Sequence, residues 1–179
     1  YGCSSLLSID IGNIVSNGVS ASNQYRGCTA LTTVPLFNLS SVTNAYAMFA
    51  YCPVTTVPLF NLSNCTSTRS MFYLCSSLTT VPLLNLSSVT NASYMFSNTA
   101  LTNVPLLNLS SVTNASYMFS GVTLTTQSYS DFLINLATLP LQSGVSFHGG
   151  NSKYNPAAAI ARAYLVSNFG WTITDGGAA

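Results

Sequence analysis

The stretch Leu78–Phe96, LTTVPLLNLSSVTNASYMF, recurs along the chain as four near-copies, itself included. The copies begin at Leu31, Val54, Leu78 and Leu101, and a decayed fifth begins at Leu124. The spacings between these starts are therefore 23, 24, 23 and 23 residues. Each full copy also carries a Met-Phe pair whose methionine lies 17 positions after the first residue. Four copies in register indicate a repeat architecture.

The period and the Leu-x-x-Leu-x-Leu pattern predict an α/β repeat fold, a leucine-rich-repeat solenoid with rungs of 23–24 residues. One repeat cannot bury its apolar edge alone, so the rungs must stack. We expect a short parallel strand from Leu31 to about Leu36 and a helical or irregular return over Val42–Phe49. The prolines inside the strand segment should keep the strand to three or four residues, and a coil with no regular ladder is the alternative. The inward side chains of the first full copy are expected to be Leu31, Val34, Leu36, Leu39, Val42, Met48 and Phe49.

Cysteines add a further column, because Cys28, Cys52 and Cys75 each stand three residues after an aromatic residue. With this ending, the pattern resembles the BspA-like leucine-rich repeats of bacterial and phage surface proteins over Tyr25 to about Thr126. Threonine and valine replace the cysteine in the later copies, and a proline lies inside each Leu-x-x-Leu-x-Leu segment. The resemblance implies a scaffold that carries binding surfaces, with no particular ligand.

Three segments follow from this pattern. Residues 1–27 form a diverged N-terminal repeat, 28–127 hold the four repeats and the decayed fifth start, and 128–179 form a capping segment. In the diverged repeat, Ile9, Ile11, Ile14 and Val19 are expected to point inward. The first residues, YGCSSL, match the repeat ending YLCSSL at 73–78, so the sequence begins within a repeat and is expected to be part of a longer chain.

The chain carries few charges: 4% of its residues are charged, its net charge is +1, and it contains no glutamate. A protein without a basic surface is a poor binder of nucleic acid. Ser, Thr and Asn make up about a third of the residues and must supply most of the polar surface. No apolar run approaches the roughly 18 residues of a membrane-spanning helix, so membrane insertion is not expected. This composition suits an extracellular protein or one packed in an assembly such as a virion.

The cysteines are predicted to be buried thiols rather than a disulfide framework. Cys3, Cys28, Cys52 and Cys75 share the ladder position, whereas Cys65 has no assigned place in the pattern. Spacings of 23 to 25 residues match no zinc motif and the chain has one histidine, so neither a metal nor a cofactor is expected.

Outward-facing columns beside the strand are the predicted functional face. One column holds threonine in every full copy, and the next reads Thr33, Thr56, Thr80 and Asn103. An apolar stripe follows at Phe37, Phe60, Leu84 and Leu107, beside a column of asparagines. A flat face with hydroxyls and an apolar stripe fits a ligand or a neighbouring subunit. The alternative is structural, because threonine favours strands and asparagine bonds the backbone at turns.

After Thr126 the period stops and a closing segment begins. We expect a helix over Asp131–Leu139 capped by Ser130, a strand over Val145–His148, a helix from Pro156 to Asn168 capped by Asn155, and a strand over Trp171–Thr174. Such an ending can cover the last rung of a stack. It also resembles the closing segments of phage-tail repeat proteins.

No set of nucleophile, base and acid can be assembled around the one histidine, so we expect no enzyme. Three roles remain open. The first is a receptor-binding or adhesion module of a phage tail fibre or virion, recognising a host-surface glycan or protein. The second is a bacterial cell-surface adhesin, and the third is a structural spacer or decoration protein of a virion that contacts neighbouring subunits or copies of itself.

Overall fold

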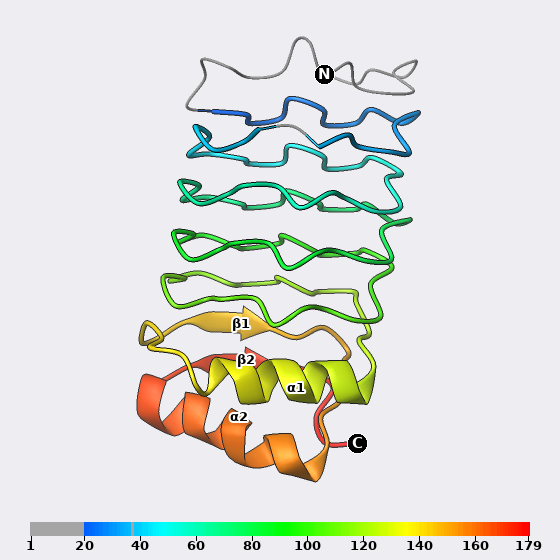
Figure 1. Ribbon diagram of the computed structural model, residues 1–179. Coiled ribbons are helices and arrows are strands. Elements are labelled where there is room, and N and C mark those ends of the chain that lie inside the picture. Colours follow the sequence, from blue (N-terminus) through cyan, green and yellow to red (C-terminus); the bar gives the residue numbers. More distant parts are fainter. Residues whose placement is uncertain (1–19, 37) are drawn as a thin grey trace.

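A computed structural model gives the fold, and it describes residues 20–36 and 38–179. The chain winds in stacked turns, one for each repeat, and ends in two helices and two short strands at one end of the stack (Figure 1). The expectations for Cys3 and for the inward residues Ile9, Ile11, Ile14 and Val19 lie outside the described residues.

Main-chain hydrogen bonds join consecutive turns through the segment that precedes and contains the Met-Phe pair. In the first full copy, every second N–H donates to the next turn: Ala45 to Ser67, Ala47 to Arg69 and Phe49 to Met71, at 2.9, 2.9 and 3.0 Å. The N–H groups between them close tight turns within their own copy, as from Met48 to Ala45. Ala47 takes a left-handed conformation with φ 51°, which turns successive amides in alternate directions.

The predicted place of the strand was therefore wrong. Isolated parallel bridges align Ser20, Asn44, Ser67, Asn91 and Asn114 in the segment that was expected to be the return. The described part of the leading segment has one such bridge, Thr56 to Thr80, and forms no regular strand. The prolines provide the physical reason, because each one removes a donor from the leading segment.

The interior of the stack is built from columns of apolar side chains. Leu31, Leu39, Val42, Met48 and Phe49 are fully buried, as predicted. The aromatic rings at the Phe49 position stack from turn to turn with centroids 5.5 to 5.9 Å apart, from Tyr25 to Phe119. Stacked rings of this kind add to the free energy that burial of their area supplies.

Leu36 was predicted to point inward, but its side chain is 62% exposed. The equivalent residues Leu59, Leu83 and Leu106 are also half exposed or more. In the last copy the Leu107 N–H donates to the Pro105 carbonyl at 2.8 Å, a three-residue turn that swings Leu106 outward. In that copy the turn at Pro105 thus reverses the inward and outward positions that follow it.

Buried thiols occupy the cysteine column, as predicted. The Cys75 thiol donates to the Phe49 carbonyl in the preceding turn at 3.1 Å, and the Cys52 thiol donates to the Tyr25 carbonyl at 2.9 Å. Cys65, which had no assigned place, is buried at the position that Val42 holds in the first copy.

The closing segment contains helix α1 (Thr126–Leu136), strand β1 (Ser146–His148), helix α2 (Pro156–Phe169) and strand β2 (Thr172–Thr174). Strand β1 pairs in parallel with β2, and it also continues the ladder of the stack, because the Phe119 N–H donates to the His148 carbonyl at 3.0 Å. The two helices pack beside these strands at the end of the stack (Figure 1).

Helix α2 begins as predicted, with Asn155 as its N-cap, and ends one residue later than predicted, at Phe169 before the left-handed Gly170. Helix α1 begins earlier than predicted, at Thr126, and also ends earlier, at Leu136. Thr125 is its cap, accepting from the Ser128 N–H, and Ser130 lies inside the helix, where its hydroxyl donates to the Thr126 carbonyl.

A buried carboxylate ties the end of the chain to the cap. Asp175, whose side chain is 2% exposed, accepts from the Arg162 Nε at 2.8 Å and from the Tyr129 hydroxyl at 2.9 Å. Arg162 also donates to the Ile173 carbonyl at 3.1 Å. This network joins α1, α2 and the residues after β2, so the cap is held as one unit.

Candidate functional site

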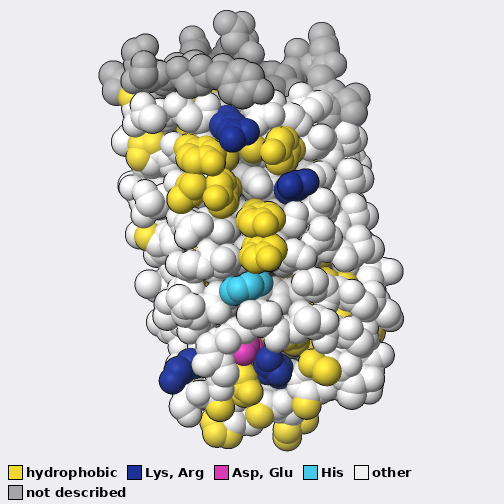
Figure 2. All heavy atoms as spheres, turned by 180° about the vertical axis from the view of Figure 1, so that it is seen from behind, with side chains coloured by type: hydrophobic (Ala, Val, Ile, Leu, Met, Phe, Trp, Pro, Cys, Tyr) yellow, Lys and Arg dark blue, Asp and Glu magenta, His cyan; other side chains and the backbone are white. Residues whose placement is uncertain are grey.

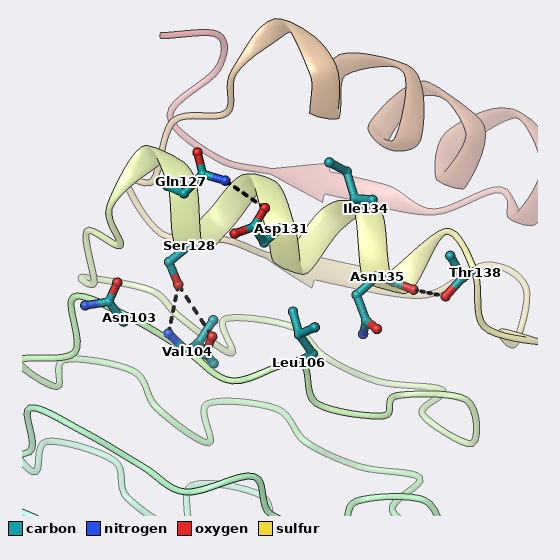
Figure 3. Close-up of a pocket in the computed structure, with 9 residues that line it drawn as sticks. All are labelled: Asn103, Val104, Leu106, Gln127, Ser128, Asp131, Ile134, Asn135 and Thr138. Atoms are coloured by element: carbon teal, nitrogen blue, oxygen red, sulfur yellow. Dashed lines mark hydrogen bonds between the residues drawn. The ribbon is translucent and has the colours of Figure 1, made fainter.

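A groove of about 600 Å³ runs between the last full copy and helix α1 (Figure 3). One wall is the leading segment of that copy, and the other is the face of α1 that repeats every three or four residues. The lining residues are Asn103, Val104, Leu106, Gln127, Ser128, Asp131, Ile134, Asn135 and Thr138.

Ser128 fixes the helix against the turn below it. Its hydroxyl accepts from the Val104 N–H at 2.9 Å and contacts the Val104 carbonyl at 3.5 Å (Figure 3). The Ser128 hydroxyl contacts both main-chain groups of Val104, and these contacts fix the distance between the two walls of the groove.

Polar groups converge on the groove from both walls. The Gln127 amide donates to Asp131 Oδ1 at 2.8 Å, and the Thr125 hydroxyl donates to Asn103 Oδ1 at 3.1 Å. Within the described part of the chain, Asp131 has no ion-pair partner and the side-chain amide of Asn135 has no hydrogen bond. These groups can therefore bond a ligand without breaking an ion pair.

Apolar side chains supply the remaining surface. Leu106 is 50% exposed and projects from the turn toward α1, and Ile134 is 39% exposed (Figure 3). A site with one carboxylate, three amides and an apolar wall can hold a neutral ligand that carries hydroxyl groups on a hydrocarbon ring. Asp131 is the one ionisable group among the lining residues, so the groove offers no acid-base pair.

The structure exposes some of the predicted site residues and buries others. Thr33, Thr56, Thr80 and Asn103 are exposed in one column, as predicted, and Asn103 lies in the groove. Phe60, Leu84 and Leu107 were predicted to form an exposed stripe, but their side chains are at most 1% exposed. Phe37 lies outside the described residues. In the last copy the turn from Pro105 to Leu107 is the physical reason, since Leu107 is buried and Leu106 is exposed there.

The asparagines beside that column have a structural role. The side chains of Asn38, Asn61, Asn85 and Asn108 each accept from the main-chain N–H two residues later, at 2.9 to 3.1 Å. These contacts match the structural alternative for the asparagines, in which the side chain bonds the backbone at a turn.

The family described as "Mycoplasma protein of unknown function, DUF285" matches residues 19–132. The chain belongs to this family. The family match covers the stacked turns and ends inside α1, so it includes Asn103, Gln127 and Asp131 but not Ile134, Asn135 or Thr138. No curated protein and no solved structure matches the chain.

Two surfaces were missed from the sequence. The exposed column Leu36, Leu59, Leu83 and Leu106 leads directly into the groove, and the polar face of α1 completes it. The signal for the second was present: Gln127, Asp131 and Asn135 are spaced by four residues, which places them on one face of a helix.

Among the described residues, no group of three or more His, Cys, Asp or Glu side chains lies close enough to hold a metal ion. In the same part of the chain, neither helix has the length and apolar character needed to cross a bilayer.

Proposed function

We propose that this chain is a non-enzymatic binding module of an extracellular or virion surface, and that the groove beside α1 binds a neutral sugar of a host-surface glycan. The observation that carries the proposal is the convergence of the Asp131 carboxylate, the Asn103 and Asn135 amides and the Leu106 side chain on one groove. Carboxylate and amide groups match the paired hydroxyls of a pyranose ring, and an apolar side chain matches its C–H face.

The stacked turns support a BspA-like leucine-rich-repeat scaffold for this module, because each turn corresponds to one copy of the repeat. The setting that we propose is a phage tail fibre or virion, with a bacterial cell-surface adhesin as the alternative. The family's description refers to Mycoplasma, which supports the bacterial setting.

The experiment is a glycan-array screen followed by titration of the best neutral glycan. Asp131→Asn removes the charge but keeps the shape, so binding should weaken about tenfold through loss of a charge-assisted hydrogen bond. Asn103→Ala should weaken it as well, while the column neighbour Thr56→Ala, which lies outside the groove, should have no effect. Circular dichroism must show the same fold for all variants.

Equal loss with Thr56→Ala would move recognition from the groove to the flat threonine column. Binding that is insensitive to both Asp131→Asn and Asn103→Ala would exclude the groove, and a screen without a bound glycan would overturn the proposal.

A structural role has support of its own in the exposed leucine column. Leu36, Leu59 and Leu83 are 59 to 62% exposed on consecutive turns, and such a stripe fits a neighbouring subunit or a second copy. The change Leu59→Ser with Leu83→Ser should then reduce self-association or incorporation into particles without altering glycan binding. Analytical ultracentrifugation measures the first effect, and unchanged sedimentation and incorporation would exclude this role.

A further inference from the structure

A small hollow of about 100 Å³ lies on the surface of the ladder segment, over the first two full copies. It is separate from the groove, since the two share no residue. Its lining residues are Arg26, Tyr46, Ala47, Ala50, Tyr51, Ser70 and Tyr73. Tyrosine rings form its sides, and small side chains leave the space between them.

One position of the repeat creates this hollow. The residue before the methionine is Ala47 and Ser70 in the first two copies, but Tyr94 and Tyr117 in the last two. All four have nearly the same left-handed backbone, with φ between 51° and 59°. The backbone is therefore constant, and the hollow exists because the first two copies lack the ring that the last two carry.

Two arginines lie close to this hollow: Arg26 is one of its lining residues, and Arg69 stacks on the ring of the lining residue Tyr46. The Arg26 guanidinium lies 5.3 Å from the centroid of the Tyr51 ring, and the Arg69 guanidinium lies 5.7 Å from that of Tyr46. A guanidinium stacked on an aromatic ring keeps its N–H groups directed outward for an anion. Arg26 bonds Asn23 Oδ1 at 3.3 Å, a neutral partner.

The distribution of charge points to an anionic ligand. Neither Arg26 nor Arg69 forms an ion pair with a described residue, whereas Arg162 is neutralised by Asp175. With four cationic side chains in the sequence, half of the positive charge lies beside this one hollow. A pair of cationic side chains that lacks a counterion among the described residues attracts an acidic group.

Aromatic side chains continue from the hollow along the stack. Tyr73 meets Tyr94 edge-on with centroids 6.1 Å apart, Tyr94 stacks on Tyr117 at 4.8 Å, and Tyr117 stacks on His148 at 5.8 Å. Figure 2 shows this face, with Lys or Arg side chains beside hydrophobic ones near the N-terminal turns and a hydrophobic column that ends on the histidine. The surface can thus contact several units of an extended chain.

The main-chain N–H groups of this face are already hydrogen-bonded within the protein, so few remain for a bound peptide. The N–H groups of Ala47 and Tyr51 donate to the next turn at 2.9 and 2.8 Å, and those of Met48 and Ala50 close turns inside the copy. Extended peptides usually obtain much of their affinity by adding a strand to free backbone groups. A ligand of this face must instead be read by rings, hydroxyls and guanidinium groups.

We propose that the hollow binds the carboxylate of an acidic sugar in a surface polysaccharide, with the neighbouring sugars lying along Tyr94, Tyr117 and His148. The volume admits a carboxylate but not a whole pyranose ring, so the ring rests on the tyrosines around the opening. Tyr51 and Tyr73, set edge-on at 5.4 Å, present both ring edges and hydroxyls there.

The test is titration with a polygalacturonate oligomer and with its methyl ester, which has the same backbone without charge. Ser70→Tyr fills the hollow with the residue that the later copies carry at this position, and should weaken binding about tenfold or more. The control Thr56→Tyr adds a ring in the exposed threonine column, which lines neither the hollow nor the tyrosine face, and should have no effect. Arg26→Gln with Arg69→Gln should abolish the preference for the free acid, while Lys153→Gln removes an exposed charge elsewhere and should not.

Equal binding of the methyl ester would overturn the proposal, as would polygalacturonate binding that survives Ser70→Tyr. A sulfated dextran oligomer that binds better would replace the carboxylate by sulfate, and polyglutamate that binds equally well would replace the sugar by an acidic protein. Asp131→Asn should leave polygalacturonate binding unchanged, so failure here and failure of the groove are distinguished.

Discussion

Leu83 and Leu84 are adjacent in the chain and opposite in burial: the side chain of Leu83 is 59% exposed and that of Leu84 is 1% exposed. The pair recurs as Leu106 and Leu107, at 50% and 0%. Substitutions at these two neighbouring positions therefore test which of the two side chains points into the stack.

Leu84→Ala should lower the free energy of unfolding by roughly 2 to 5 kcal/mol, because it opens a cavity in the packed interior. Leu83→Ala makes the same chemical change one residue away and should cost less than about 0.5 kcal/mol, as for an exposed position. Urea unfolding followed by circular dichroism measures both. Similar costs for the two variants would contradict the register described for these turns.

Features of this fold that depend on neighbouring residues in the chain were predicted better than features that depend on contacts between turns. Helix α2 was located correctly because its cap Asn155, its first-turn Pro156 and its terminal Gly170 act locally. The burial of Met48 and Phe49 was predicted because the repeat places them in every turn. The ladder was misplaced because left-handed residues four positions apart, such as Ala47 and Tyr51, interrupt the two-residue period of a strand.

The candidate sites were harder to predict, for different physical reasons. The predicted apolar stripe was displaced by one residue, since a turn at Pro105 depends on main-chain geometry that composition does not reveal. The tyrosine face was missed because its rings come from different positions of the repeat, as with Tyr51 and Tyr73, and meet only after stacking. Column-by-column reading of a repeat cannot find such a face.

Thr68 is fully buried, and its hydroxyl has no hydrogen-bond partner in the described part of the chain. The equivalent residues Ala45, Ala92 and Ala115 are apolar. Thr68→Val keeps the shape and removes the unsatisfied hydroxyl, so it should raise the free energy of unfolding by about 1 kcal/mol.

The matched change is Thr99→Val, because the Thr99 hydroxyl is also buried but donates to the Phe96 carbonyl at 2.9 Å. Its loss should lower the free energy of unfolding by about 1 kcal/mol. Thermal unfolding should show a higher melting temperature for Thr68→Val and a lower one for Thr99→Val. Destabilisation by Thr68→Val would show that the Thr68 hydroxyl does have a hydrogen-bond partner.

Cys75 should be unreactive in the folded protein. Burial, and to a smaller degree the nearby Cys52, raises the pKa of its thiol to about 12. Because the thiolate is the reactive form, alkylation at pH 8 should be very slow in native protein and fast in urea. Peptide mass spectrometry resolves Cys75 from the other cysteines, and an introduced Thr79→Cys on the exposed face of the next copy provides the fast control. Native labelling of Cys75 as fast as that control would contradict its burial.

His148 should make stability depend on pH in a narrow range. Burial lowers the pKa of His148 below its ordinary value of 6.5, with Asp175 opposing that shift in part. Its Nδ1 accepts the Gly150 N–H at 3.0 Å, and this contact requires the neutral ring. As the pH falls through 6.5, the histidine of the unfolded chain takes up a proton before that of the folded chain does. The free energy of unfolding therefore has its full value above pH 6.5 and decreases as the solution becomes more acidic.

The composition makes this effect measurable, because the sequence has one histidine and three acidic residues. We expect the melting temperature to fall between pH 7 and pH 5.5, and His148→Asn to remove most of that slope while the high-pH value changes little. A slope that persists in His148→Asn would assign the proton uptake to another group. A melting temperature that rises toward acid would mean that the folded protein favours the charged ring, stacked on Tyr117, over the bond to Gly150.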